Sequence, residues 1–166
     1  MRTLPRQKLR HWRRGSSRPL HSIANLEFGV YTRIMYNPCH CTRLRTATRK
    51  VAAFYDAALA PTGINIAQFA LLRTVARRGS LSLTELGRLL GLDRSTMGRN
   101  VRVVEKDGLV TIGKGKDQRE AVVSLTDQGQ AVLKAAEPRW AKSQDELTAR
   151  LGPDRMQFLD ELERLL

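Results

Sequence analysis

Apolar residues recur along most of this chain at the 3.6-residue spacing of an amphipathic helix. The clearest stripe runs from Thr42 to Ala60, and Pro61 ends it because proline lacks the amide that a helix needs. Pro138 lies inside a later stripe and is expected to kink that helix. The pattern therefore predicts a mainly α-helical chain. Further helices are predicted to begin after Asn65, at Ser82, at Arg94, after Thr126 and at Pro153.

The stretch from Ser82 to Leu125 is organised differently, since two short helices there precede two short apolar runs. Ser82 and Glu85 have the spacing of a capping box. Gly91 suits the left-handed end of one helix, and Asp93 suits the N-cap of the next. Helix, tight turn, helix and hairpin in this order are typical of a winged helix-turn-helix. The predicted elements are helices over 82–90 and 94–106 and strands over 109–112 and 121–125, with a Gly/Lys tip between the strands and Leu81 as a short third strand.

The second of these helices has two chemically different sides. Met97, Val101 and Val104 share one side, whereas the opposite side is cationic and has no acid before Glu105. Such a face can read base edges or contact phosphates in a major groove; the alternative is a solvated cationic surface. We predict that DNA contacts come from Thr84, Arg94, Ser95, Thr96, Arg99 and Arg102, with Lys114 and Lys116 of the hairpin on phosphates.

Five segments of the chain match the motifs of one known family: Ser82–Gly87, Asp93–Arg99, Val104–Val110 for Leu-Glu-x-x-Gly-Leu-Val, Asp117–Arg119 for Asp-x-Arg, and Leu125–Gly129 for Leu-Thr-x-x-Gly. Together they resemble the MarR family of transcription regulators, and a weaker likeness extends over about Cys41 to Leu166. The resemblance implies that the N- and C-terminal helices interlock two copies of the chain. It also implies that Arg119 supports the wing or enters the minor groove beside it, while Asp117 holds Arg119 or an arginine of the recognition helix in place.

The net charge of +13 indicates a polyanionic partner, and it is unevenly distributed. Residues 1–34 hold eight basic residues and one acid. This segment is predicted to be a disordered tail; alternatives are a basic arm on DNA, or translation that begins at Met35. Residues 35–166 then form one MarR-like domain, with the winged helix-turn-helix over 64–125 and dimerisation helices over 39–60 and 126–166.

The first and last helices carry more large apolar side chains than one small winged domain can cover. Each contributes about 1.5–3 kcal/mol when fully buried. We therefore expect a homodimer; the alternative is that these helices cap a single winged domain. Two-fold symmetry predicts a pseudo-palindromic operator with half-sites about 34–36 Å apart. The side chains concerned are Leu44, Val51, Phe54, Trp140, Phe158, Leu159 and Leu162.

No pattern in the chain favours an enzyme, a metal site, a cofactor or a membrane span. The Gly113–Lys116 run lacks the spacing of a phosphate-binding loop. Cys39-His40-Cys41 offers too few ligands for a zinc site. These thiols, near a helix start and Arg43, suit redox sensing; the alternative is inert packing at a dimer interface. Two cysteines provide no disulfide framework, which favours a reducing cytoplasm.

Regulators of the resembling family often bind phenolic or aromatic acids between the dimerisation helices and the winged domain. By that analogy a ligand pocket here is lined by Phe54, Tyr55, Phe69, Leu72 and Arg73, although each of these equally suits an ordinary core. The predicted function is a sequence-specific homodimeric repressor released by a small aromatic ligand or an oxidant. The alternatives are a sequence-tolerant structural DNA-binding protein and a thiol-redox enzyme.

Overall fold

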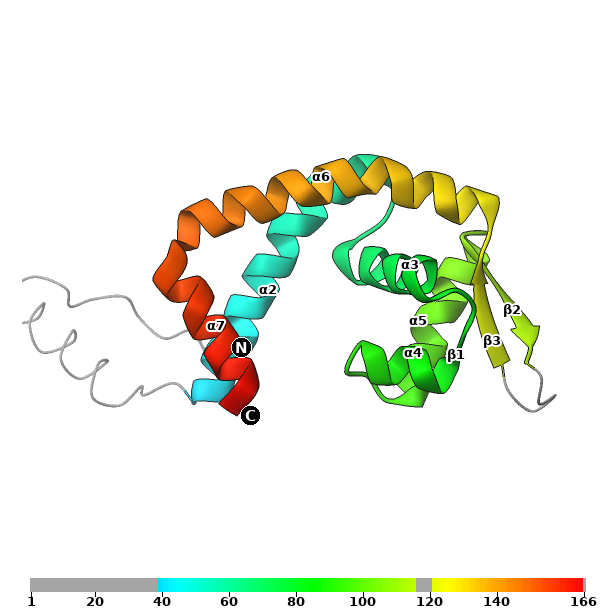
Figure 1. The fold of residues 1–166 in the computed structure, drawn as a ribbon, viewed down its shortest axis with the longest axis horizontal. Helices are drawn as coiled ribbons and strands as arrows, with labels where there is room; N and C mark the ends of the chain where they lie inside the picture. Colours follow the sequence, from blue (N-terminus) through cyan, green and yellow to red (C-terminus); the bar gives the residue numbers. More distant parts are fainter. Residues whose placement is uncertain (1–38, 116–120, 166) are drawn as a thin grey trace, which may run out of the picture. The chain divides into compact units, whose positions relative to one another are not determined.

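The structure is a computed structural model that describes residues 39–115 and 121–165 (Figure 1). The chain divides into two compact units, Met1–Arg43 and Leu44–Leu166, and most of the first lies outside the described residues, as does the predicted tail. The elements in order are α2 (His40–Leu59), a 3-10 turn (Ala60–Thr62), α3 (Ile66–Arg78), β1 (Leu81–Ser82), α4 (Leu83–Leu89), α5 (Arg94–Lys106), β2 (Val110–Lys114), β3 (Ala121–Leu125), α6 (Asp127–Leu151) and α7 (Pro153–Leu165).

The winged helix-turn-helix predicted from the sequence is confirmed. Helices α3, α4 and α5 pack around one apolar core, and a three-stranded antiparallel sheet in the order β1-β3-β2 adjoins it (Figure 1). Every stripe residue expected to face inward on α5 is fully buried. The largest fully buried side chains are Leu59, Phe69, Leu72, Leu86, Met97, Val101, Val104, Val110 and Val123.

The hairpin is longer than the sequence pattern predicted. Its first strand begins at Val110 rather than Leu109, and Gly113 and Lys114, expected at the tip, pair with Val122 and Ala121 of β3. The register that aligns Val110 with Leu125 extends to these two residues, whose lack of apolar side chains had concealed the strand. Leu109 is buried just before the strand, where its amide donates to the Val104 carbonyl at 2.9 Å.

Most predicted helix starts are confirmed, but α4 begins at Leu83 and not at Ser82, which lies in β1 and is the N-cap. Asn65 and Gln68 form a complete capping box, in which each side chain bonds the other residue's amide at 2.9 Å. Ser82 accepts the amide of Glu85 at 3.2 Å, but the Glu85 carboxylate pairs with Arg88 at 2.7 Å instead of closing the box. An arginine one turn along the helix gives this carboxylate a charged partner, which is a stronger attraction than a neutral amide.

The tight turn between α4 and α5 depends on two glycines. Gly91 has φ of 65°, the left-handed conformation that the sequence predicted. A Cβ on Gly87 would lie 2.7 Å from the carbonyl oxygen of Leu92, so only glycine lets the turn fold back this closely. The amide of Leu92 donates to the Gly87 carbonyl at 2.8 Å. These contacts fix the angle at which α5 leaves the turn.

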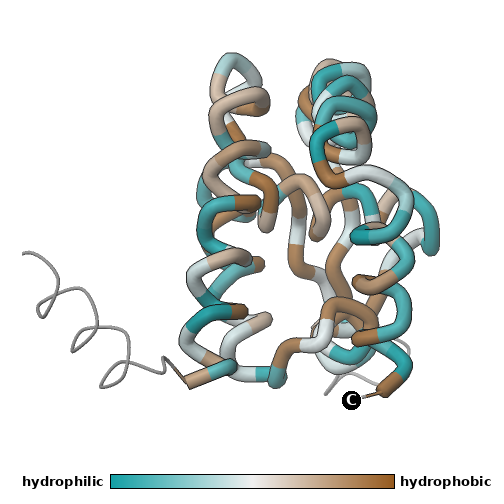
Figure 2. Tube along the Cα trace, turned by 90° about the vertical axis from the view of Figure 1, so that its left-hand side faces the viewer, coloured by the Kyte–Doolittle hydropathy of each residue, from teal (hydrophilic) through white to brown (hydrophobic). Residues whose placement is uncertain are grey.

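A single helix, α6, runs from Asp127 to Leu151 with Pro138 inside it, and the kink expected at Pro138 stays a prediction. Gly152 ends α6, and Pro153 begins α7, both as predicted. Helix α7 has no buried residue, and α2 buries only Tyr55 and Leu59. Figure 2, viewed from the side of α2 and α7, shows hydrophobic positions recurring among hydrophilic ones along the helices.

Candidate nucleic-acid interface

Helix α5 is anchored on one side and open on the other. Met97, Val101 and Val104 are fully buried, so the rotation of the helix about its axis is fixed. The opposite side is therefore held toward solvent by packing rather than by its own polar contacts. The exposed residues of α5 are Arg94, Ser95, Arg99, Arg102, Val103, Glu105 and Lys106.

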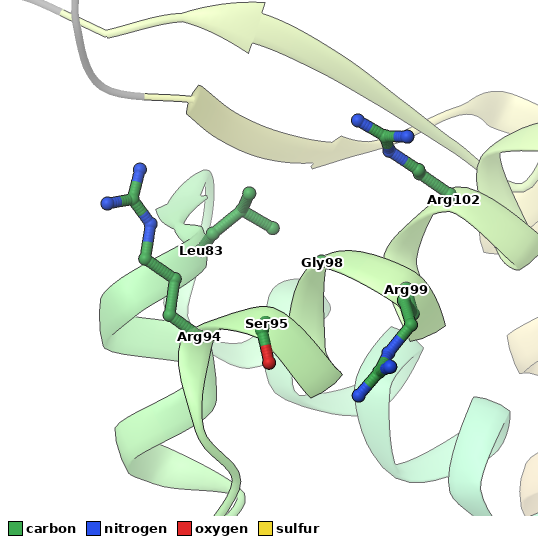
Figure 3. A pocket seen from close by; sticks show the side chains of 6 residues that line it. All are labelled: Leu83, Arg94, Ser95, Gly98, Arg99 and Arg102. Carbon is green, nitrogen blue, oxygen red and sulfur yellow. The ribbon is translucent and has the colours of Figure 1, made fainter.

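A hollow of about 440 Å³ lies along this exposed side. No acidic side chain lines it, and three of its six lining residues are arginines (Figure 3). The guanidinium groups of Arg94 and Arg102 point toward the hairpin, whereas Ser95 and Arg99 point to the other side of the helix (Figure 3). The lining residues are Leu83, Arg94, Ser95, Gly98, Arg99 and Arg102. This surface offers positive charge and hydrogen-bond donors to an anionic, groove-shaped partner.

Asp93 organises the start of the helix. One carboxylate oxygen accepts the amides of Ser95 and Thr96, both at 2.9 Å, and so provides the predicted N-cap. The carboxylate also accepts both hydroxyl groups, from Ser95 Oγ at 2.6 Å and from Thr96 Oγ1 at 2.7 Å. These bonds hold the pKa of Asp93 far below its usual range, and the bond from the Ser95 hydroxyl lowers it most. Asp93 therefore stays ionised throughout the physiological range.

Thr96 connects this cap to an arginine. Its Oγ1 accepts from Arg99 Nη2 at 3.2 Å, so Asp93, Thr96 and Arg99 form a short chain of hydrogen bonds along α5. Sequence reasoning had listed Ser95, Thr96 and Arg99 as separate contacts and Asp93 only as a cap. Their helical spacing was visible in the sequence, but the rotamers that join them were not.

Two residues of the hollow, Leu83 and Gly98, were missed by sequence reasoning. Gly98 follows Met97 in the middle of α5, and a Cβ there would have no atom within 4 Å. A glycine in a helix interior with open space beside it costs stability relative to alanine, roughly 0.5–1 kcal/mol. That local cost was the one feature in the sequence that set Gly98 apart from its neighbours on α5.

The remaining predicted DNA contacts are only partly described. Thr84 is exposed in the first turn of α4 and does not line the hollow, where its neighbour Leu83 lies instead. Lys114 is exposed at the end of β2. The other three predicted wing residues, Lys116, Asp117 and Arg119, lie outside the described residues.

Cys39 and Cys41 are both exposed and both free thiols. Cys39 directly precedes α2, and the backbone amide of Thr42, followed by that of Cys41, lowers the pKa of its thiol. Exposure and a lowered pKa are the conditions under which a cysteine reacts with oxidants.

The residues of the predicted ligand pocket are partly in contact, since Phe54 lies edge to face with Tyr55 at 5.6 Å and Arg73 lies 5.9 Å over the Phe69 ring. Tyr55, Phe69 and Leu72 are buried, and the Tyr55 hydroxyl donates to Gln144. Arg73 lies over the Trp140 ring at 3.9 Å, and Trp140 in turn stacks on Phe69. The remaining residue of the five, Phe54, lines a hollow of about 350 Å³ between α2 and α6.

Over residues 39–115 and 121–165, no three His, Cys, Asp or Glu side chains are close enough together to hold a metal ion. Within the same residues, every helix is too short or too polar to cross a bilayer.

A cationic helix held outward by a buried opposite face, entered by a tight turn and followed by a hairpin, defines a winged helix-turn-helix DNA-binding protein. Residues 62–120 match the model of the MarR family. The chain is 31% identical over 115 residues to the HTH-type transcriptional repressor Rv2887 of Mycobacterium tuberculosis, covering 66% of this chain and 81% of the relative. The chain belongs to the MarR family of transcriptional regulators, as its motifs indicated, and the members of this family are not enzymes.

Solved structures agree with this assignment. The M. tuberculosis transcriptional regulator MosR in complex with DNA is 34% identical, with a TM-score of 0.69 over 77% of this chain and 96% of that one. A probable transcriptional regulator from Pseudomonas aeruginosa is 27% identical, with a TM-score of 0.68 over 76% of this chain and 96% of that one.

Proposed function

We propose that this protein is a homodimeric repressor that binds a pseudo-palindromic operator through α5 and the wing. One observation carries the proposal: the exposed side of α5 presents three arginines around an acid-free hollow, while its other side is locked in the core. Arginine is the side chain best suited to guanine edges, and it also contacts phosphates. The repressor role is supported by the relative of 31% identity that carries this name.

The dimer is supported by apolar side chains that the single chain leaves in water. On α7, Phe158 is 56% exposed and Leu165 is 80% exposed, although α7 has a helical apolar stripe. On α2, Leu44 and Val51 are also exposed. Exposed apolar side chains on the two terminal helices suit burial against a second copy of the same helices.

The deciding experiment is footprinting of the purified protein on genomic fragments, followed by affinity measurements on the protected sequence and on random DNA. Arg99→Ala should weaken operator binding by about 1–3 kcal/mol and change random-DNA binding much less. Thr111→Ala, an exposed change on β2, is the matched control. Equal wild-type affinity for operator and random duplex at physiological salt would favour a sequence-tolerant DNA-binding protein instead.

We propose oxidation of Cys39 as one route of release, supported by its exposure and by the amides that lower the pKa of its thiol. The thiolate attacks one peroxide oxygen, the O–O bond breaks, hydroxide leaves and the sulfur retains the oxygen as sulfenic acid. Mild peroxide should therefore weaken operator binding by the wild type but not by Cys39→Ser, with Cys41→Ser measured beside it. Full affinity of the oxidised wild type would dismiss this route.

A small aromatic acid is the second candidate for release, and Arg73 supports it. The Nε of Arg73 is buried, and nothing in the described residues accepts a hydrogen bond from it. Its guanidinium lies against the Trp140 ring, so a carboxylate and an aromatic ring would both find complementary groups there. Salicylate titrated into the wild type and into Arg73→Met, with operator binding as the readout, tests this candidate.

A further inference from the structure

The Ser95 hydroxyl has its only proton committed inside the protein. It donates to Asp93 at 2.6 Å, and an ionised carboxylate carries no proton of its own, so the direction of this bond is fixed. The bond is charge-assisted and therefore stronger than a bond to a neutral acceptor. Toward the outside, Ser95 can offer only lone pairs.

The major groove contains few groups that donate to a lone pair. Phosphate oxygens, guanine N7 and O6, adenine N7 and thymine O4 all accept, so none can bind Ser95 while Asp93 holds its proton. The exocyclic amino groups of adenine and cytosine are the donors that remain. The Thr96 hydroxyl also donates to Asp93, but its oxygen already accepts a hydrogen bond from Arg99 at 3.2 Å.

We propose that Asp93 fixes Ser95 as a hydrogen-bond acceptor, so that Ser95 reads the amino group of an adenine or a cytosine in each operator half-site. Asp93 is a positioning residue in this scheme and contacts no base. The inference rests on the proposed function, because it assumes that α5 enters the major groove. Ser95 lines the hollow of α5 and points to the same side as Arg99, so the base that it reads lies near the one read by Arg99 (Figure 3).

The test begins with the operator defined by footprinting. Each adenine in the half-site is replaced by purine and each cytosine by pyrimidin-2-one, since these analogues lack only the amino group. For the wild type, one replacement per half-site should weaken binding about three- to ten-fold, the effect of one lost hydrogen bond. The same replacement outside the footprint is the control. The base at the position where loss of the amino group weakens binding, an adenine or a cytosine, is the base that Ser95 reads.

Two variants assign that effect. In Ser95→Ala the acceptor is absent, so the base replacement that weakens wild-type binding should lower the affinity of this variant less than two-fold. In Asp93→Ser the helix keeps a good N-cap, but the Ser95 proton is released and can turn outward. This variant should keep its melting temperature within a few degrees and should bind better than the wild type when thymine or guanine occupies the sensitive position, because the freed hydroxyl can donate as well as accept.

The outcomes separate the inference from the function that it assumes. A wild type that binds no defined operator overturns both. A defined operator with no amino group coupled to Ser95, or an unchanged penalty in Ser95→Ala, overturns the inference alone. A folded Asp93→Ser variant that discriminates against thymine and guanine at the sensitive position as strongly as the wild type shows that Asp93 does not set the direction of the bond, and this result also overturns the proposal.

Discussion

At the scale of single residues, Gly129 shows how the Leu-Thr-x-x-Gly motif works. Thr126 accepts the Gly129 amide at 2.9 Å and donates to the Gly108 carbonyl at 2.7 Å, which draws the start of α6 onto the end of α5. A Cβ on Gly129 would overlap the carbonyl oxygen of Leu109 and would lie 3.1 Å from Leu125 Cδ2. No side chain fits between these groups without moving the backbone.

Gly129→Ala should therefore lower the free energy of unfolding by about 1–3 kcal/mol, as overpacking of a core does. Urea unfolding followed by circular dichroism measures this. Gly98→Ala is the control, because it is also a helical glycine but has open space around its Cβ position. It should raise stability by roughly 0.5–1 kcal/mol. Equal effects of the two substitutions would contradict the steric explanation.

The sequence predicted which residues lie on the exposed side of α5 better than it predicted the hydrogen bonds between them. The 3.6-residue spacing separated the buried Met97 side of α5 from the arginine side, because packing alone determines that division. The spacing carried no information on rotamers, so it did not reveal that Asp93 binds the hydroxyl of Ser95. Leu83 was missed because a leucine in an apolar stripe looks like core.

At the scale of elements, caps and glycines predicted most boundaries because their effects are local. Asn65, Asp93 and Thr126 each accept a backbone amide at the helix start that the sequence indicated. The predicted end of β2 was wrong, since the pairing of Lys114 with Ala121 depends on a partner strand several residues away. Pairing of that kind is set by register, which a single strand's composition does not encode.

Helix α6 supplies a prediction at this scale. Pro138 is exposed in the interior of the helix, where it removes one backbone hydrogen bond. Pro138→Ala should raise the free energy of unfolding by about 1–3 kcal/mol, since an interior proline costs about 3 kcal/mol relative to alanine. Pro153→Ala is the matched control, because proline in a first turn costs no bond and is pre-organised for the helix. A stabilisation of equal size at both positions would refute the argument.

At the scale of the whole molecule, the exposed apolar side chains of α7 are the surface that the proposed dimer would bury. Phe158, Leu159 and Leu165 are exposed on one side of this helix, whereas Gln157 occupies another side and bonds Glu161 at 2.8 Å. An operator with two half-sites rewards a dimer, because binding of one recognition helix holds the other close to its own half-site. In the proposed dimer, burial of the apolar side of α7 would thus be coupled to DNA affinity.

Phe158→Glu should therefore convert the proposed dimer to a monomer, since a carboxylate in an apolar contact loses its hydration without gaining a partner. Sedimentation velocity measures the association state, and Gln157→Glu adds the same charge on the other side of α7 as the control. The monomer should keep its circular dichroism spectrum but lose about 100-fold or more in operator affinity, the gain that a second tethered contact provides. Its affinity for an isolated half-site should equal that of the wild type. A dimeric Phe158→Glu variant with full operator affinity would show that this side of α7 is not the interface.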